Sequence, residues 1–262
     1  MRRALGVQSL MGDVGRHLID LPQLPYQEHG LQVWAAHVVA RRAARLAAQE
    51  GLKDLVPAYV AAFEALASSL RRVEGRISAV TELSPRRSAI LANYISGTTL
   101  VESAILDGYN TQAAALVRQE LEGIAALEEL RNGQRRERRT PNVRNVPSIP
   151  GAIYSDLSAA AHLSCTGFLR ALAAHSGNLV NAPGITEAPM LTPQYRPEFA
   201  RRLFGVHTLL LIHLVEHHDL HNVDLHGVEA TDVEAGLAAK ALELLVRCGV
   251  VEVRDAGQQN IG

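Results

Sequence analysis

The sequence has few cysteines, few lysines, few aromatic residues and no long apolar run. Its only cysteines are Cys165 and Cys248 in 262 residues, so a disulfide framework is not expected and a reducing compartment fits. The N-terminus carries positive charge, but no apolar stretch follows it as in a signal peptide. No segment approaches the roughly 18 apolar residues of a membrane span. We therefore expect a cytoplasmic protein without a membrane partner.

Lysine is nearly absent, because only Lys53 and Lys240 among the 26 basic residues are lysine. Together with abundant alanine and leucine, this bias is typical of a GC-rich bacterial genome. The 27 acidic residues leave a net charge of −1, so no overall field attracts nucleic acid or an anionic membrane. Phosphate-binding GxxxxGK and GxGxxG patterns, a CxxC pair and a GxSxG turn are also missing. These absences disfavour the common nucleotide-binding and hydrolase folds.

Helical spacing of apolar residues dominates what is present, and it predicts an all-α fold. The spacing is found in seven segments, at 29–50, 52–80, 85–106, 110–130, 153–172, 198–226 and 231–245. We predict a bundle of about seven helices with two long loops, forming one domain over residues 29–248. An irregular N-terminal arm at 1–28 and a C-terminal tail at 249–262 complete the chain, and residues 250–253 have the composition of one short strand.

The clearest helical segment carries two interleaved seven-residue series. These are Leu52, Tyr59, Leu66, Val73 and Val80, and Val56, Phe63, Leu70 and Ile77. Asp54 is the expected N-cap. Because the flanking positions are also apolar, we expect this helix to bury a wide stripe within the bundle, including Phe63 and Leu70, rather than to form a two-stranded coiled coil.

Two long segments interrupt the helices. Residues 131–151 hold six arginines, at 131, 135, 136, 138, 139 and 144, with three prolines and one acidic residue. Residues 175–197 hold four prolines. Loops of this length in a compact domain are usually functional or disordered. The first, which we call the arginine loop, is a candidate polyanion-binding segment, but it has no aromatic residue for stacking on bases. A solvated loop sensitive to proteases is the alternative.

Histidine is concentrated near one helix end, where five of the 11 histidines fall between His213 and His226. His213, His217, His221 and Asp224 share one helical face, and imidazoles four residues apart can bind one metal ion, zinc being the best fit. A third imidazole eight residues from the first lies about 12 Å away along the axis, so only two can share an ion on a straight helix. The alternative is a polar helix end.

A second set of candidate residues follows the arginine loop. Tyr154, Ser158 and His162 are spaced four residues apart on one helical face, which fits either a ligand-directed triplet or an internal polar seam. Arg118 and Glu122 are spaced alike in the 110–130 helix. They form either a surface ion pair or an arginine held for a phosphate.

The order of these segments resembles an uncharacterised family of bacterial helical proteins similar to the HEPN superfamily. The resemblance covers about residues 85–226, from the turn Asp107-Gly108-Tyr109-Asn110 to the segment Tyr154-Ser155-Asp156-Leu157-Ser158, with His162 and Ser164 beyond it. It implies a helical bundle, paired with itself, and a link to RNA or to bacterial stress and phage-defence systems. The positions that match the family pattern are Arg118, Glu122, Tyr154, Ser158 and His162.

Many HEPN proteins are ribonucleases with an arginine, four to six residues and then a histidine. This chain has three such pairs, Arg170 with His175 and both Arg201 and Arg202 with His207, about as many as chance gives. The sequence therefore leaves three functions open. They are an HEPN-like module acting through a protein partner, a homo-oligomer or RNA; a metal-dependent enzyme using the histidine-rich helix; and an RNA-binding protein using the arginine loop.

Overall fold

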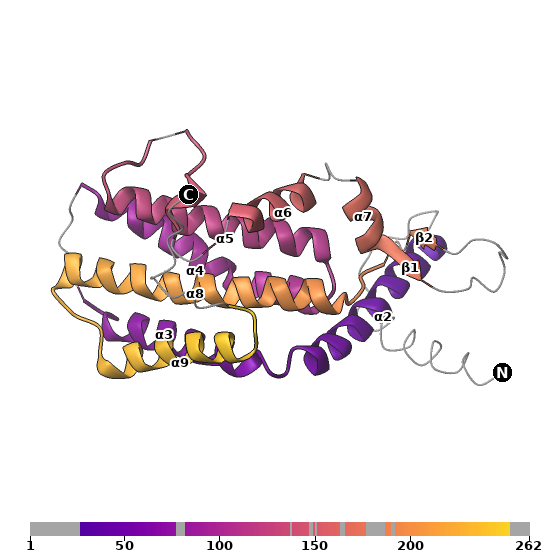
Figure 1. Cartoon of the computed structure of the whole chain (residues 1–262), viewed down its shortest axis with the longest axis horizontal. Helices are drawn as coiled ribbons and strands as arrows, with labels where there is room; N and C mark the ends of the chain where they lie inside the picture. The colour runs from indigo at the N-terminus through magenta and orange to yellow at the C-terminus, as the bar shows by residue number, and fades with distance from the viewer. Residues whose placement is uncertain are drawn as a thin grey trace, which may run out of the picture.

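The computed structural model describes residues 27–76, 82–136, 138–146, 149, 151–162, 166–176, 187–189 and 192–251. Over these ranges the chain forms a bundle of helices, as Figure 1 shows, and the predicted all-α class is confirmed. The expected arm at 1–28 lies outside the described residues except for Gln27 and Glu28, which begin the first helix rather than end an arm. The tail beyond Val251 also lies outside them.

The elements follow the expected order with two differences. In chain order they are α2 (Gln27–Gly51), α3 (Val56–Arg72), α4 (Ser84–Leu106), α5 (Asn110–Arg131), the 3-10 turn η1 (Val143–Asn145), α6 (Gly151–Ala161), α7 (Thr166–Ala173), β1 (Ala174–Ser176), β2 (Glu187–Pro189), α8 (Pro197–His226) and α9 (Asp232–Arg247). The segment predicted as one helix at 153–172 is divided between α6 and α7. The second predicted loop contains β1 and β2, which pair antiparallel.

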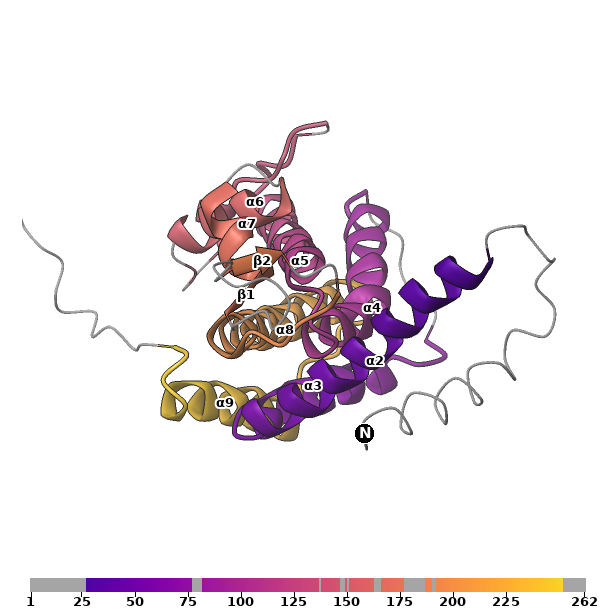
Figure 2. The same ribbon diagram turned by 90° about the vertical axis from the view of Figure 1, so that its right-hand side faces the viewer.

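Helix α8 is the centre of the bundle. Every residue from Leu203 to Val215 is buried, and a helix that is apolar on all sides belongs in a core. Helices α3, α4, α5 and α9 all contact it. Figure 2 shows α8 between α4 and α5 on one side and α3 and α9 on the other.

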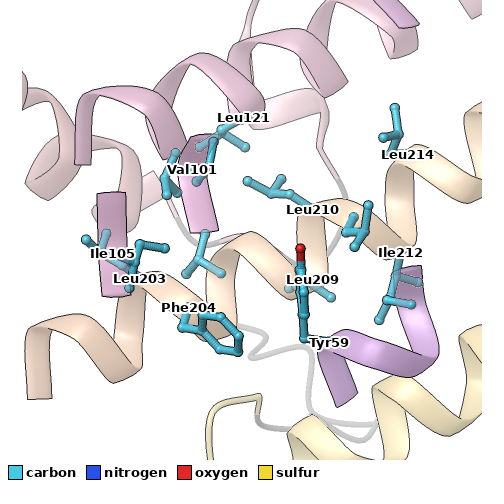
Figure 3. Packing of buried hydrophobic residues seen from close by; sticks show 14 of the residues in the cluster. Tyr59, Val101, Ile105, Leu121, Leu203, Phe204, Leu209, Leu210, Ile212 and Leu214 are labelled. Atoms are coloured by element: carbon cyan, nitrogen blue, oxygen red, sulfur yellow. The ribbon is translucent and has the colours of Figure 1, made fainter. Parts of the chain in front are cut away.

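The surrounding helices supply the rest of the core. Figure 3 shows Tyr59 of α3, Val101 and Ile105 of α4, and Leu121 of α5 directed towards α8. Their neighbours on α8 belong to one buried cluster that includes Leu203, Phe204, Leu209, Leu210, Ile212 and Leu214. Burial of such side chains is the main driving force for folding, at about 1.5–3 kcal/mol for each fully buried one.

Helix α3 differs from its predicted form. It ends at Arg72, and its N-cap is Leu55 without a side-chain bond, while Asp54 binds Arg201 instead. Phe63 and Val56 are 37% and 40% exposed, so the expectation of burial was wrong for these two members of the second series. Leu70 is partly buried against the core, and Ile77 lies outside the described residues. The buried face consists largely of small residues, Ala58, Ala61, Ala62, Ala65 and Ser69, with Tyr59 and Leu66. Small side chains at a contact let neighbouring helices approach closely. The larger Phe63 and Val56 lie outside this contact.

Two sequence signals position α9 as expected. Gly227 ends α8 with φ of 63°, a left-handed conformation that glycine adopts without strain. Thr231 and Glu234 then form a capping box at the start of α9, because each side chain bonds the other residue's backbone N–H. The short connection between these caps lays α9 against α3 and α8.

Two helices leave uncharged or apolar surface exposed. Among the described residues, α4 is the one helix that is long and apolar enough to cross a membrane. A third of its most apolar 18-residue stretch is buried in the bundle. In α2, the apolar spacing predicted a buried face, yet Leu31, Trp34 and Leu46 are exposed. Figure 1 shows α2 extending away from the other helices.

Candidate functional site

Four of the five residues that match the HEPN-like pattern meet where α5 faces α6; we call them the Arg118 cluster. Arg118 donates from Nε to Glu122 Oε1 at 2.9 Å, one turn further along α5. The Tyr154 hydroxyl accepts from Arg118 Nη2 at 3.2 Å and donates to Glu122 Oε1 at 3.0 Å. Arg118 Nη1 contacts His162 Nε2. The cluster thus joins two helices that the arginine loop separates in sequence.

The position of α6 explains why these side chains meet. Leu157 and Ala160 are buried, belong to the same core as α5, and fix the inner face of α6. Tyr154 and His162 lie two turns apart at the edge of that face, and the long Arg118 side chain reaches both. Figure 1 shows α6 lying beside α5.

Electrostatics keep Arg118 charged. Burial lowers the pKa of Arg118, but the hydrogen bond with Tyr154 and the charge of Glu122 together raise it above the ordinary value. The guanidinium also lies 5.2 Å from the centre of the Tyr154 ring, within the range of a cation–π contact. Its bonds to described residues use three of the five N–H groups of a guanidinium, so two remain for a ligand.

The cluster is accessible enough to meet a ligand. The side chains of Arg118 and Glu122 are 19% and 25% exposed, and His162 is exposed. A fixed guanidinium binds the oxygens of a phosphate or carboxylate well, and an accessible imidazole is the usual proton donor or acceptor in catalysis. The arrangement therefore suits recognition of a phosphate group.

Ser158 is the member of the predicted triplet that does not join the cluster. Its hydroxyl is buried and has no hydrogen-bond partner among the described residues. Tyr154 and His162 do share a contact, Arg118, as their helical spacing allowed. Ser164, the other residue of the resemblance, lies outside the described residues.

The candidate metal ligands on α8 each have a different partner. His213 Nδ1 lies 3.1 Å from Glu216, His217 Nε2 lies 3.3 Å from Glu128, and His221 Nε2 lies 3.0 Å from Ser88. Asp224 pairs with Arg87. Within the described ranges, no three His, Cys, Asp or Glu side chains are arranged to hold a metal ion. Among the described residues, these four side chains therefore contact α4, α5 and α8 itself and do not meet at one metal centre.

Burial lowers the pKa of two of these histidines, His217 and His221. The pKa of His217 falls to about 4. His213, His217 and His221 are all less than a tenth exposed. His217 and His221 connect α8 to α5 and α4, and their lowered pKa values favour the neutral imidazole.

A network around Arg72, which the sequence analysis did not identify, lies beside the histidines. Arg72 bonds Asp219 at 2.5 Å, Glu234 at 3.1 Å and the backbone oxygens of Val228 and Glu229. Ser69 lies at its centre and contacts both Asp219, at 2.5 Å, and His218 Nδ1, at 2.7 Å. The Arg72 network thus joins α3, α8 and α9. The only signal in the sequence is a set of charged residues at positions that face the core.

A buried pair, Glu120 and His207, was also not predicted from the sequence. Glu120 Oε2 lies 2.8 Å from His207 Nδ1, and both side chains are buried between α5 and α8. Glu120 follows Val117 and precedes Leu121 and Ile124 on the buried face of α5. A charged residue at such a position is the signal that could have identified the pair.

The arginine loop is partly anchored. Arg135 bonds Glu129 at 3.3 Å and the backbone oxygens of Arg136 and Arg139, each at 2.8 Å. Glu129 also accepts the backbone N–H of Asn142 at 2.7 Å. This carboxylate therefore folds the loop back on the end of α5. Arg131 is the last residue of α5, and the other four arginines, Arg136, Arg138, Arg139 and Arg144, are exposed.

Comparison with known proteins gives no match, whether with protein-family profiles, with curated proteins or with solved structures.

Proposed function

We propose that this protein is an HEPN-like helical module that binds RNA through its phosphates. The observation that carries the proposal is the Arg118 cluster, in which four residues of the HEPN-like pattern hold one guanidinium at the surface. A charged guanidinium with two free N–H groups is a good partner for a phosphate oxygen pair. The setting that the resemblance implies, bacterial stress or phage defence, belongs to the same proposal.

The arginine loop extends this surface. Its four exposed guanidinium groups follow α5 directly, and both views show the loop and α6 on the same outer side of α5. Arg135 is held by Glu129, so it orders the loop while its neighbours stay accessible. Arginine side chains displayed in this way neutralise successive phosphates of a polyanion.

The type of binding follows from the composition of the surface. The loop has no aromatic residue, so base stacking does not contribute there and affinity rests on phosphate contacts. The net charge of the chain is −1, so attraction is local to these arginines. We expect binding that tolerates different sequences and weakens steeply as salt increases.

Fluorescence anisotropy with a labelled single-stranded RNA, over a series of NaCl concentrations, tests this proposal. The wild type should bind, and the double variant Arg138→Gln/Arg139→Gln should bind more weakly. Removing one arginine–phosphate interaction should reduce the slope of log K against log salt by about 0.7. Arg118→Gln should also weaken binding, whereas Arg118→Lys keeps the charge but loses the two-pronged geometry and should give an intermediate result.

The matched control is Arg42→Gln/Arg71→Gln, which removes two exposed guanidinium groups from α2 and α3. RNA binding and its salt slope should be unchanged in this variant. Equal losses in the two double variants would show that binding depends only on overall charge. No measurable binding by the wild type at low salt would exclude the proposal.

A second candidate function, self-association, is favoured by α2. This helix exposes Val33, Trp34, Val39 and Leu46, and a hollow of about 330 Å³ beside it is lined by Val33, Trp34, His37, Val38, Arg41 and Tyr109. Exposed apolar side chains grouped on one helix are typical of an interface between proteins. The resemblance implies a protein paired with itself, and α2 is the surface that fits such pairing.

Light scattering coupled to gel filtration tests the pairing. The wild type should have the mass of a dimer, and Val33→Glu should shift it to the monomer because a charge is placed in the interface. Val233→Glu is the control, since Val233 is 68% exposed on α9 and Val33 is 62% exposed. A monomeric wild type, or equal effects of the two substitutions, would exclude pairing through α2.

A further inference from the structure

A pocket of about 530 Å³ lies between α4 and α5, on the side of α5 next to the Arg118 cluster. It is lined from α4 by Ala89, Ile90, Asn93, Tyr94, Gly97, Leu100 and Val101, from α5 by Leu116, Gln119, Glu120, Glu122, Gly123 and Ala126, and from the arginine loop by Arg135 and Pro141. Its size falls in the range of small-molecule sites, and most of its lining is apolar.

A glycine on each wall shapes the pocket: Gly97 borders open space, and Gly123 lets the Tyr94 ring lie close to α5. A Cβ at Gly97 would meet nothing within 4 Å, so a side chain at this position would project into empty space. On the opposite wall, a Cβ at Gly123 would lie 3.2 Å from the Tyr94 ring. Glycine destabilises a helix interior relative to alanine. Its presence on both walls is explained if the pocket itself has a use.

The inner part of the pocket contains polar atoms that lack partners. Glu120 and Tyr94 both line it and are only 6% and 7% exposed. Glu120 uses Oε2 for His207, but Oε1 and the Tyr94 hydroxyl have no hydrogen-bond partner among the described residues. A buried carboxylate oxygen without a donor is strongly destabilising, so this oxygen calls for a donor group.

Charge selects the kind of donor. Glu120 is a carboxylate with an imidazole on one oxygen only. Arg135 is the one cationic residue in the described lining, and it is paired with Glu129. The other polar lining residues, Asn93, Gln119 and Glu122, offer acceptor oxygens. A cationic N–H group therefore fits the inner part of the pocket better than an anion or a neutral acceptor.

The protonation of the two buried groups agrees with this chemistry. Burial raises the pKa of Glu120 above its usual value, while His207 opposes that shift. Burial and the Glu120 charge raise the pKa of Tyr94, so its hydroxyl stays neutral and can accept a hydrogen bond. A bound cation would favour the ionised form of Glu120.

We propose that this pocket binds a small organic amine, with its apolar body between α4 and α5 and its protonated amino group on Glu120 Oε1. The pocket borders the RNA surface through Glu122 and Arg135, but the groups that recognise the amine are not those proposed to bind RNA, so the two proposals can be tested independently. Glu120 and Tyr94 recognise the amino group, and Gly97 leaves space for the apolar body.

Isothermal titration of the full chain with three matched probes tests the proposal. Tryptamine carries a cation, tryptophol a neutral hydroxyl and indole-3-propionate an anion on the same ring system. Tryptamine should bind about tenfold or more tightly than tryptophol, because only the cation forms a charge-assisted bond with Glu120. Indole-3-propionate should bind most weakly of the three.

Two variants locate the binding. Gly97→Leu places a side chain in the space where an added Cβ meets nothing within 4 Å, so it should abolish tryptamine binding, while the melting temperature stays at or above that of the wild type. Gly236→Leu is the control, since Gly236 lies inside α9 and also has nothing within 4 Å of an added Cβ. Binding should be unchanged there. Glu120→Gln should remove the preference for tryptamine over tryptophol.

Several results would overturn the proposal. Equal affinity for all three probes would mean that the pocket recognises only their apolar ring system. Undiminished binding to Gly97→Leu would mean that tryptamine binds outside this pocket. No binding of tryptamine to the wild type would mean that an amine does not meet Glu120 Oε1. If Glu120→Gln fails to fold, the comparison of Gly97→Leu with Gly236→Leu still decides the matter.

Discussion

The Arg72 network and the Arg118 cluster contain the same kinds of residue but differ in burial. Each has an arginine bonded to a carboxylate, with a hydroxyl and an imidazole nearby. The Arg72 side chain is 10% exposed and its partner Glu234 is 1% exposed, whereas the Arg118 pair lies closer to solvent. The first set joins three helices, and the second joins two.

Residue type alone therefore does not show whether an arginine stabilises the fold or binds a ligand. Its burial and the number of N–H groups that it has left do. Arg72 makes five bonds, as many as a guanidinium has N–H groups: Nε bonds Glu234, Nη1 bonds two backbone oxygens, and Nη2 bonds Ser69 and Asp219. An incoming ligand would have to break them. Arg118 still has N–H groups to offer, next to an exposed histidine. We therefore expect substitutions in the network to affect folding, and substitutions in the cluster to affect binding.

The largest effect should come from Arg72→Ala. This change leaves Asp219 and Glu234 without their cation, and removing one partner of a buried pair costs about 3–5 kcal/mol. Urea denaturation measures the free energy of unfolding. Arg71→Ala, at the exposed neighbouring position, is the control and should change it by less than about 0.5 kcal/mol. Equal values for the two variants would mean that the network contributes no more than surface charge does.

Acid should destabilise the protein through histidines in and next to the same network. Burial lowers the pKa of His217 and of His218 to about 4, whereas an unfolded histidine has a pKa near about 6.5. Between these values the unfolded chain binds protons that the folded chain does not, so the free energy of unfolding falls as the pH drops. The loss approaches roughly 3 kcal/mol for each histidine by about pH 4.

Buried carboxyl groups oppose part of this loss. Burial raises the pKa of Asp219 and of Glu120, so the folded state gains relative stability as these groups take up protons. Urea denaturation at several pH values between about 7 and 4 should show a net decrease, and His217→Gln should flatten it. A pH dependence that His217→Gln leaves unchanged would show that His217 titrates normally in the folded protein.

Much of the fold could be predicted from the sequence because helix signals are local. Apolar spacing predicted α8 and α9, and the structure has a glycine end at Gly227 and a capping box at Thr231 close to the predicted boundaries. Local signals do not show which face meets a neighbour. In α3, large side chains such as Phe63 outweighed the alanines in the prediction, although the alanines form the close contact. The break between α6 and α7 had no clear breaker residue to mark it.

The candidate site could be predicted only in part. Spacing placed Arg118 with Glu122, and Tyr154 in line with His162, but it could not bring the two helices together across the arginine loop. The resemblance joined these residues in one set, and the structure shows them in contact. The histidine-rich helix shows the opposite case. Spacing grouped these histidines on one face, yet the partners that His217 and His221 meet on α5 and α4 lie more than 80 residues away in the chain.

Two serines provide the smallest and most closely matched test of the comparison. Ser69 Oγ is buried and bonds His218, Asp219 and Arg72, so Ser69→Ala removes a hydroxyl on which several groups depend. That change should cost about 1–3 kcal/mol. Ser158 Oγ is buried without a partner among the described residues, so Ser158→Ala removes an unsatisfied group and should be neutral or stabilising by up to about 1 kcal/mol. Melting curves and urea denaturation of both variants measure the difference. A Ser158→Ala variant as unstable as Ser69→Ala would show that the Ser158 hydroxyl has a partner in the folded protein.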